Sequence, residues 1–262
     1  MEVIIRPDTE RAVNLVVKLI ISRITEMPNA TLGLATGRTM ERVYAKLVAS
    51  GVSFAGCHTF NLDEYIGLSP DDPDSYRTYM NTHLFDHVDI DPANTHVPNG
   101  NAADIKAAAL EYEAAIVDAG GINLQLLGIG TAGHIGFNEP LSSIMSRTRD
   151  KALTPTTRVQ NAEMFGGDPD RVPKRALTMG VGTILDAQEL VLLATGPAKA
   201  SIVAKAVEGP ITSMVSASAI QMHPNCKVVV DEDAADQLQG REYYDFIFDN
   251  EPEWESYRTQ KT

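Results

Sequence analysis

The sequence predicts an α/β protein: a single doubly wound domain over residues 1–262, with a mostly parallel, Rossmann-like sheet. Short apolar runs alternate along the chain with longer segments of helical periodicity, which is the β-α-β-α order of such folds. The runs LQLLGI and LVLLAT are continuously hydrophobic, as are strands that are covered on both faces. Strands are expected at residues 3–5, 31–35, 59–62, 124–129, 190–195 and 227–230.

Helices are expected between these strands. Asp8 and Thr9 can cap a first helix, in which apolar residues recur at helical spacing from Ala12 to Ile24. The segment MERVYAKLV predicts a second helix, and residues 104–117 and 198–207 two more. No repeat or flexible linker divides the chain, so residues 140–175 are expected to form a short excursion from the one domain.

Composition excludes several classes of protein. The net charge of −13 and the pI of 4.8 disfavour binding to nucleic acid, because an acidic surface repels phosphate backbones. Apolar stretches are interrupted by charge before 18 residues, and the first residues lack a basic region before an apolar block. We therefore expect no membrane span, no signal peptide and a cytoplasmic location. Cys57 and Cys226 are far apart, and the six histidines are scattered, so we expect reduced thiols and no metal.

Four polar, glycine-bearing loops follow predicted strands. In doubly wound sheets, ligands bind outside the carboxyl ends of the strands. The loops are residues 36–39 (TGRT), 63–65 (DEY), 128–140 and 196–199 (GPAK). They are expected to meet at one edge of the sheet and to form the functional site there.

Two of these loops have the chemistry of an anion site. Gly37 lets the backbone approach a phosphate at a helix N-terminus, Thr36 and Thr39 add hydroxyl donors, and Arg38 adds charge. The alternative is a tight turn with a threonine cap. Lys199 can bind a phosphate as a point charge or lie in solvent. The Walker A pattern is absent, which argues against nucleoside triphosphate hydrolysis.

The other two loops carry candidate acid–base groups. Asp63 ends a predicted strand and could act as a general base. Because Glu64 is adjacent, we expect one functional carboxylate and one structural or solvated neighbour. His134 lies in the glycine-rich segment GIGTAGHIGFNEP, and Glu139 could hold its ring in one tautomer.

Taken together, FNLDEYIGL, LLGIGTAGHIGFNEP and ATGPAKA resemble the glucosamine-6-phosphate deaminase family (glucosamine/galactosamine-6-phosphate isomerases), and the likeness runs over residues 2–235. The related 6-phosphogluconolactonases share a glycine-rich GH loop but not its FNEP ending. The resemblance implies conversion of glucosamine 6-phosphate to fructose 6-phosphate and ammonia without a cofactor. It makes Asp63 the base that moves a proton between C2 and C1, His134 the ring-opening residue and Glu139 its orienting carboxylate. It also makes residues 36–39 and Lys199 the phosphate site.

Two positions depart from the family pattern. Ala132 stands where the family has Asp or Asn, and Glu163 stands where many members have an arginine on the phosphate. Either Glu163 points away, or Arg38 or Arg158 supplies the missing charge. Alternatively the substrate is galactosamine 6-phosphate, or the chain is a catalytically impaired, sugar-phosphate-binding variant.

The resemblance also implies assembly and regulation. Some family members are hexamers activated by N-acetylglucosamine 6-phosphate, so a homo-oligomer with an allosteric site is expected here. Ser142, Arg149 and Lys151 match positions used for that effector, and Tyr243 and Tyr244 lie near the place of a contributing C-terminal tyrosine.

Overall fold

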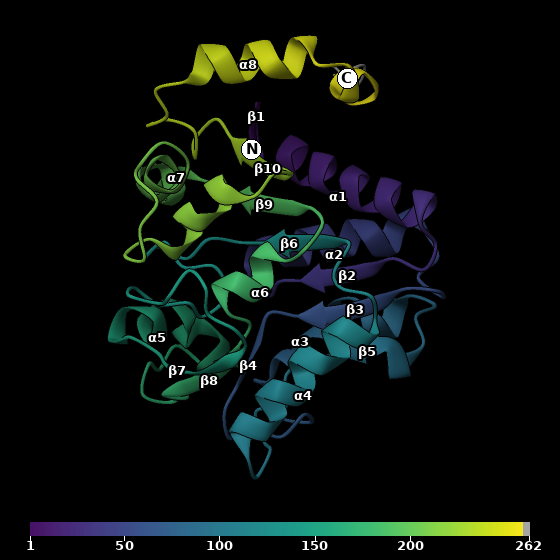
Figure 1. Ribbon diagram of the computed structural model, residues 1–262, viewed down its shortest axis with the longest axis vertical. Helices are drawn as coiled ribbons and strands as arrows, with labels where there is room; N and C mark the ends of the chain where they lie inside the picture. The colour runs from purple at the N-terminus through teal and green to yellow at the C-terminus, as the bar shows by residue number, and fades with distance from the viewer. Residues whose placement is uncertain (259–262) are drawn as a thin grey trace.

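The structure is a computed structural model that describes residues 1–258, and it confirms the α/β fold class (Figure 1). Within these residues, seven parallel strands form one sheet in the order β1-β10-β9-β6-β2-β3-β5. The six predicted strands are all in this sheet, and the two-residue edge strand β5 is added. The strands are β1 (Glu2–Arg6), β2 (Thr31–Leu34), β3 (His58–Asn61), β5 (Thr95–His96), β6 (Leu124–Leu127), β9 (Leu190–Ala194) and β10 (Cys226–Asp231).

Four strands end earlier than the sequence predicted. β2, β3, β6 and β9 stop at Leu34, Asn61, Leu127 and Ala194, before Ala35, Leu62, residues 128–129 and Thr195. The residues that follow are apolar or small, as strand residues are, but they already belong to the loops that line the main cavity. The hydrophobic pattern therefore continues past the last residue that the neighbouring strands pair with.

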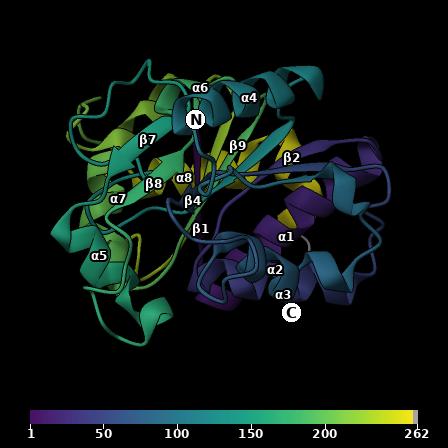
Figure 2. The same ribbon diagram turned by 90° about the horizontal axis from the view of Figure 1, so that it is seen from below.

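Helices cover both faces of the sheet. In Figure 2, α1, α2 and α3 lie on one side and α4 and α6 on the other. Asp8 caps α1 by accepting a hydrogen bond from the Arg11 amide, as the sequence indicated. The helices are α1 (Thr9–Glu26), α2 (Arg38–Ser50), α3 (Tyr76–His83), α4 (Ile105–Asp118), α5 (Pro155–Asn161), α6 (Val181–Leu185), α7 (Ala200–Val207), α8 (Arg241–Asn250) and α9 (Glu255–Arg258). Short 3-10 helices span Phe85–His87, Pro92–Asn94, Ala162–Phe165, Pro197–Lys199, Ser216–Met222 and Pro252–Trp254.

A second, antiparallel sheet contains β4 (Asp63–Tyr65), β8 (Arg175–Thr178) and β7 (Arg149–Ala152) in that order. The segment DEY is therefore not the end of the predicted strand at 59–62, because it leaves that strand after Leu62 and pairs with β8. Helix α5 and the 3-10 helix Ala162–Phe165 lie between β7 and β8. We call residues 149–178 the cover segment; it includes most of the excursion predicted at 140–175.

The main core lies between the parallel sheet and its helices. Every residue of β6 and β9 is buried, which explains why these strands are continuously hydrophobic. Cys57 and Cys226 are buried, unlinked thiols. Over residues 1–258, no helix combines the length and the apolar character that crossing a membrane requires.

Candidate active site

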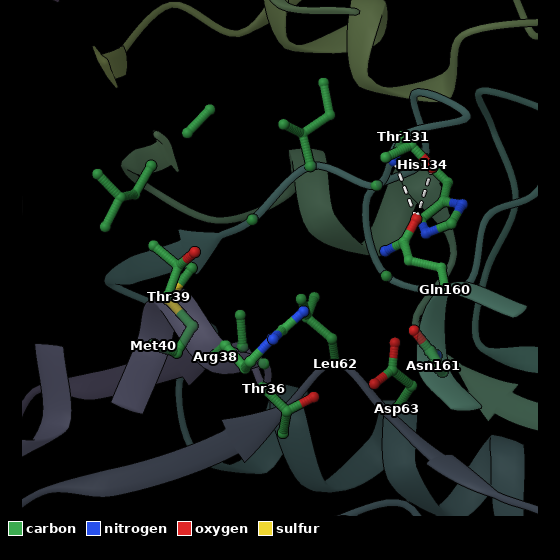
Figure 3. A pocket seen from close by; sticks show the side chains of 18 of the residues that line it. Thr36, Arg38, Thr39, Met40, Leu62, Asp63, Thr131, His134, Gln160 and Asn161 are labelled. Atoms are coloured by element: carbon green, nitrogen blue, oxygen red, sulfur yellow. Dashed lines mark hydrogen bonds between the residues drawn. The ribbon is translucent and has the colours of Figure 1, made fainter. Parts of the chain in front are cut away.

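A cavity of about 650 Å³ lies beyond the carboxyl ends of β2, β3, β6 and β9 (Figure 3). Residues from the four predicted loops line it, together with part of the cover segment. The structure thus brings together Asp63, His134, Lys199 and the TGRT loop. The full lining is Ala35, Thr36, Gly37, Arg38, Thr39, Met40, Glu41, Leu62, Asp63, Tyr76, Gly128, Ile129, Gly130, Thr131, His134, Gly136, Phe137, Gln160, Asn161, Glu163, Met164, Leu193, Ala194, Thr195 and Lys199.

The TGRT loop presents the N-terminus of α2 to the cavity. Gly37 precedes the helix with a φ of 121°, a conformation that favours glycine. No side chain of the described residues caps this end of α2, so the helix dipole and the first amides can act on an anion. The hydroxyl of Tyr79 donates to the Gly37 carbonyl at 2.9 Å and fixes the turn. The Arg38 side chain reaches over the cavity (Figure 3).

Lys199 supplies a second positive charge to the cavity. Its Nζ donates to the Ile129 carbonyl at 2.7 Å. Burial lowers the pKa of the Lys199 ammonium, because the charged form loses hydration. Within residues 1–258 no carboxylate forms an ion pair with Lys199, so this charge is available to an anionic ligand.

Asp63 and Glu64 have separate environments. Glu64 accepts backbone hydrogen bonds from Tyr65, Tyr76 and Arg77 at 2.8 to 3.0 Å and so holds the N-terminal end of α3. Asp63 is only 6% exposed and lines the cavity. Burial, together with the nearby charge of Glu64, raises the pKa of Asp63 to about 8, although the Phe137 amide opposes this. A carboxylate with this pKa is suited to taking and returning protons near neutral pH.

His134 and Glu139 form a buried pair, of which His134 lines the same cavity as Asp63. The His134 Nδ1 lies 3.5 Å from the Glu139 Oε2, which is longer than an ordinary N–H···O hydrogen bond. Burial alone would raise the pKa of Glu139, but His134 and hydrogen bonds from Thr157 and the Thr154 amide lower it to about 2. An ionised Glu139 favours the proton on Nδ1 and leaves the His134 Nε2 free for substrate.

The loop glycine Gly130 makes room for the imidazole. A Cβ atom at this position would lie 2.1 Å from the His134 Nε2. Gly130 therefore lets the ring lie against the loop backbone. Ala132 belongs to the same loop, but it adds only a methyl group and is not part of the cavity lining.

The cover segment contributes residues that the sequence analysis missed. The Gln160 Oε1 accepts hydrogen bonds from the Thr131 amide and hydroxyl at 3.1 and 2.7 Å (Figure 3). Asn161 lies beside Asp63 in the same view, and its Nδ2 donates to the Tyr65 hydroxyl at 2.9 Å. A polar pair at the end of a short helix carries no motif, so nothing in the sequence pointed to these two residues.

The two expected sources of phosphate charge differ in position. Arg38 lines the cavity and pairs with Glu163, with 2.8 Å between Nη1 and Oε2. Arg158 does not line the cavity; its guanidinium donates to the Pro169 and Val172 carbonyls and pairs with Asp170. The reason is that Arg158 faces the loop between α5 and β8, where it satisfies backbone oxygens. Glu163 does not point away but faces Arg38.

The residues expected to bind an effector lie outside the cavity lining. Ser142 donates its amide to the Glu139 carbonyl at 3.0 Å, and its buried Oγ has no hydrogen-bond partner among the described residues. Arg149 donates to the Asn138 Oδ1 at 2.8 Å, while Lys151 is partly buried on the same strand, β7. At the other end of the chain, the Tyr244 hydroxyl bonds to Glu208, and Tyr243 is exposed on α8.

The chain has an α/β fold, and one cavity gathers the N-terminus of α2, Lys199, Asp63 and His134. The family model described as glucosamine-6-phosphate isomerases/6-phosphogluconolactonase matches residues 8–229, and the chain belongs to this family.

Named relatives agree with this assignment. The chain is 49% identical over 259 residues to the glucosamine-6-phosphate deaminase of Mycolicibacterium smegmatis, covering 97% of this chain and 99% of that protein. It is also 49% identical over 251 residues to that of Hahella chejuensis, covering 94% and 95%.

Solved structures share the fold. A protein described as a monomeric glucosamine-6-phosphate deaminase has a TM-score of 0.88 and 43% identity, covering 90% of this chain and 100% of that one. A 6-phosphogluconolactonase from Trypanosoma cruzi has a TM-score of 0.75 at 17% identity, covering 91% and 97%, and it shares the fold alone.

Proposed function

We propose that the protein is a glucosamine-6-phosphate deaminase, which converts glucosamine 6-phosphate and water to fructose 6-phosphate and ammonia. The observation that carries this proposal is the position of Asp63, buried with a raised pKa, in the same cavity as the anion-binding groups and His134, which pairs with Glu139 behind the cavity wall. The relatives named above support the same activity.

The anion-binding groups hold the phosphate of the substrate in this proposal. The N-terminus of α2, the hydroxyls of Thr36 and Thr39, and the charges of Arg38 and Lys199 all face one cavity. Arg158 has no part in this because its guanidinium is bonded elsewhere.

The acid–base groups then act at the other end of the sugar. His134 moves a proton between the C1 hydroxyl and the ring oxygen, which opens the ring, and Glu139 holds the imidazole in the required tautomer. Asp63 takes the proton from C2, the electron pair of that C–H bond forms a C1–C2 double bond, and the former carbonyl oxygen at C1 takes a proton from the ammonium group at C2, which gives an enolamine. Return of the proton from Asp63 to C1 leaves a protonated imine at C2. Water hydrolyses this imine to the ketone and releases ammonia.

Product analysis tests the proposal. Ammonia and fructose 6-phosphate are measured after incubation with glucosamine 6-phosphate, in the chain as it stands and in Ala132→Asp. We expect turnover in both, and a higher rate in Ala132→Asp because a carboxylate near His134 can orient the ring or contact the substrate. Asp63→Asn is the inactive control.

Other outcomes are equally informative. Activity only in Ala132→Asp would make the chain an impaired, sugar-phosphate-binding deaminase. Activity only with galactosamine 6-phosphate would make that epimer the substrate. Hydrolysis of a sugar-phosphate lactone without ammonia release would contradict the proposal.

Assembly, location and regulation complete the proposal. We infer a homo-oligomer activated by N-acetylglucosamine 6-phosphate at Ser142, Arg149 and Lys151, in a cytoplasmic enzyme. The unpartnered Ser142 Oγ and the link from Arg149 to Asn138 support an effector site here. The 43% identical neighbour is described as monomeric, so light scattering of the purified chain is the direct test of assembly, and a monomer would remove the oligomer from the proposal.

A further inference from the structure

We propose that Glu163 is an internal competitor for Arg38: the phosphate of an incoming ligand must displace the Glu163 carboxylate, and that displacement releases one attachment of the cover segment. The inference deepens the proposed function, because it concerns the phosphate end of the same cavity. It predicts that removal of an acidic side chain strengthens anion binding specifically through Arg38.

The Arg38–Glu163 pair joins two elements across the cavity. Arg38 is the first residue of α2, and Glu163 lies on the 3-10 helix Ala162–Phe165 of the cover segment. The Nη1 to Oε2 distance is 2.8 Å, and both residues line the cavity. Their side chains are 78% and 68% exposed. An ion pair this exposed is weak, so a bound ligand can replace it.

A phosphate is a stronger partner for Arg38 than a single carboxylate. A guanidinium can bind phosphate through two parallel, charge-assisted hydrogen bonds. The α2 N-terminus adds its dipole beside Arg38, and Lys199 adds a cation that no carboxylate of the described residues holds. Together with Arg38, these groups favour a phosphate dianion over the single carboxylate of Glu163 that pairs with Arg38 in the structure.

The charge of the cavity lining makes displacement necessary. Its carboxylates are Glu41, Asp63 and Glu163, whereas Arg38 and Lys199 are its lysine and arginine cations among the described residues. If Glu163 stayed beside Arg38, the entering phosphate would meet a like charge at the position of its best partner. The free energy is lower when Glu163 turns toward solvent.

The two other contacts that the cover segment makes at the cavity, through Gln160 and Asn161, contain no charge that a phosphate could take over. Gln160 accepts two neutral hydrogen bonds from Thr131, and Asn161 donates one to the Tyr65 hydroxyl. The cover segment also stays attached by the pairing of β8 with β4, by the Arg171–Asp74 ion pair and by the bond from Arg149 to Asn138. Loss of the Arg38–Glu163 contact therefore frees only its edge at the cavity. The ion pair is the one attachment, of the three at the cavity, that responds directly to an anionic ligand.

The experiment is a double-mutant cycle read by calorimetric titration of inorganic phosphate at low, constant ionic strength. The variants are Glu163→Gln, Arg38→Gln and the double substitution. We expect Glu163→Gln to tighten phosphate binding about two- to fivefold, the range of an exposed ion pair. We also expect Arg38→Gln to weaken binding more in the Glu163→Gln background than in the natural chain, because only there is Arg38 free beforehand.

Asp170→Asn is the matched control. It removes a carboxylate and an ion pair, that with Arg158, from the same cover segment without touching the cavity. Its phosphate affinity should equal that of the natural chain, whereas general charge repulsion would make it resemble Glu163→Gln.

Additive effects of the two substitutions would overturn the proposal, since simple repulsion adds and competition does not. Failure of Glu163→Gln to tighten binding, or the absence of phosphate binding in every variant, would also overturn it. Because phosphate binding does not require turnover, these outcomes are separate from the product analysis. A chain that shows the coupling but releases no ammonia would refute the proposed function alone.

Discussion

Asp63 and Glu64 are neighbours in the sequence, yet their carboxylates have opposite surroundings. Alternate residues of a strand face opposite sides, so β4 directs one carboxylate into the cavity and the other toward α3. Three backbone amides solvate Glu64, whereas Asp63 is buried with one opposing amide, that of Phe137. The sequence analysis expected one functional and one structural member of this pair. In the structure, the two carboxylates differ in their hydrogen-bond donors and in whether they face the cavity.

The raised pKa of Asp63 predicts the pH dependence of the reaction. A general base must be ionised, so kcat/KM should rise about tenfold per pH unit below its pKa and level off above it. With a pKa of about 8 for Asp63, the rise should extend through the range from pH 6.5 to pH 8. Initial rates between pH 6.5 and 9.5 test this. Glu64→Gln removes the neighbouring negative charge and should move the profile to lower pH, while a flat profile would exclude Asp63 as the base.

The same pKa predicts that Asp63 destabilises the folded protein at alkaline pH. A carboxyl with a pKa of about 8 in the folded chain and 3.8 in the unfolded chain binds its proton more tightly when folded. The contribution of the Asp63 proton to the free energy of unfolding is therefore fully present below pH 4. It falls as the pH rises to 8, by at most about 6 kcal/mol. The side chain of Asp63→Asn cannot ionise, so this variant should be more stable than the natural chain at pH 9. The difference in the free energy of unfolding should be much smaller at pH 5.

Urea unfolding at pH 5, 7 and 9 measures this difference. Asp118→Asn, which changes an exposed carboxylate at the end of α4, is the control and should show no such trend. A stability gain that is equal at all three pH values would contradict the assignment of the effect to ionisation.

The loop after β6 depends on glycine to hold the imidazole in place. The Gly130 Cα lies so close to His134 that any Cβ would overlap the ring. At Gly128, by contrast, the nearest atom to an added Cβ is the flexible end of Met40, at 3.3 Å. Gly130 is therefore needed to make room for the His134 ring, whereas a methyl group at Gly128 would meet only a side chain that can move.

Gly130→Ala should therefore displace the His134 ring while the sheet stays intact. A displacement of about 1 Å in a catalytic group can reduce the rate about 100-fold, which is the fall in kcat/KM that we expect. Gly128→Ala should cause a clearly smaller fall, because the Met40 side chain can move aside. Far-UV circular dichroism checks folding in both variants. Equal losses in the two variants would show that general loop damage, not contact with His134, sets the rate.

The elements differ in how far the sequence could predict them. Six of the seven strands of the parallel sheet in the described residues were predicted within two residues at each end, because burial on both faces leaves a continuous apolar run such as LVLLA in β9. The two-residue edge strand β5 was not predicted. The antiparallel sheet was not predicted. Its strand β7 reads RDKA, with no apolar run, and β4 pairs with β8, which lies more than a hundred residues later in the chain. Local patterns cannot contain such a pairing.

The loops of the site were predictable for a related reason. Glycines and polar groups directly after buried strands are local signals, and they identified the TGRT, DEY and GH loops. The contribution of the cover segment was not predictable, because Gln160 and Asn161 reach the cavity only through the fold of β7, α5 and β8. Which of Arg38 and Arg158 faces the cavity likewise depended on the backbone oxygens that surround Arg158.

Across the whole molecule, the proposed effector residues are connected to the active site by direct bonds. Arg149 on β7 donates to the Asn138 side chain, and the Asn138 Nδ2 donates to the Ile135 and Met179 carbonyls. Ser142 donates its amide to Glu139, the partner of His134. A ligand that changes the position of Arg149 or Ser142 therefore acts on the residues next to the His134–Glu139 pair, and on β7 at the start of the cover segment.

This connection predicts activation that depends on Arg149. Saturating N-acetylglucosamine 6-phosphate should lower the KM for glucosamine 6-phosphate about fivefold or more, the lower end of ordinary allosteric coupling. Arg149→Gln should abolish the shift while substrate still binds. Arg175→Gln is the control, since Arg175 lies on the adjacent strand β8 and pairs with Asp150. Because coupling is reciprocal, a substrate analogue should tighten effector binding by the same factor in calorimetry.

An unchanged KM at saturating effector in the natural chain would remove the regulatory proposal. An unchanged response in Arg149→Gln would place the effector at another site.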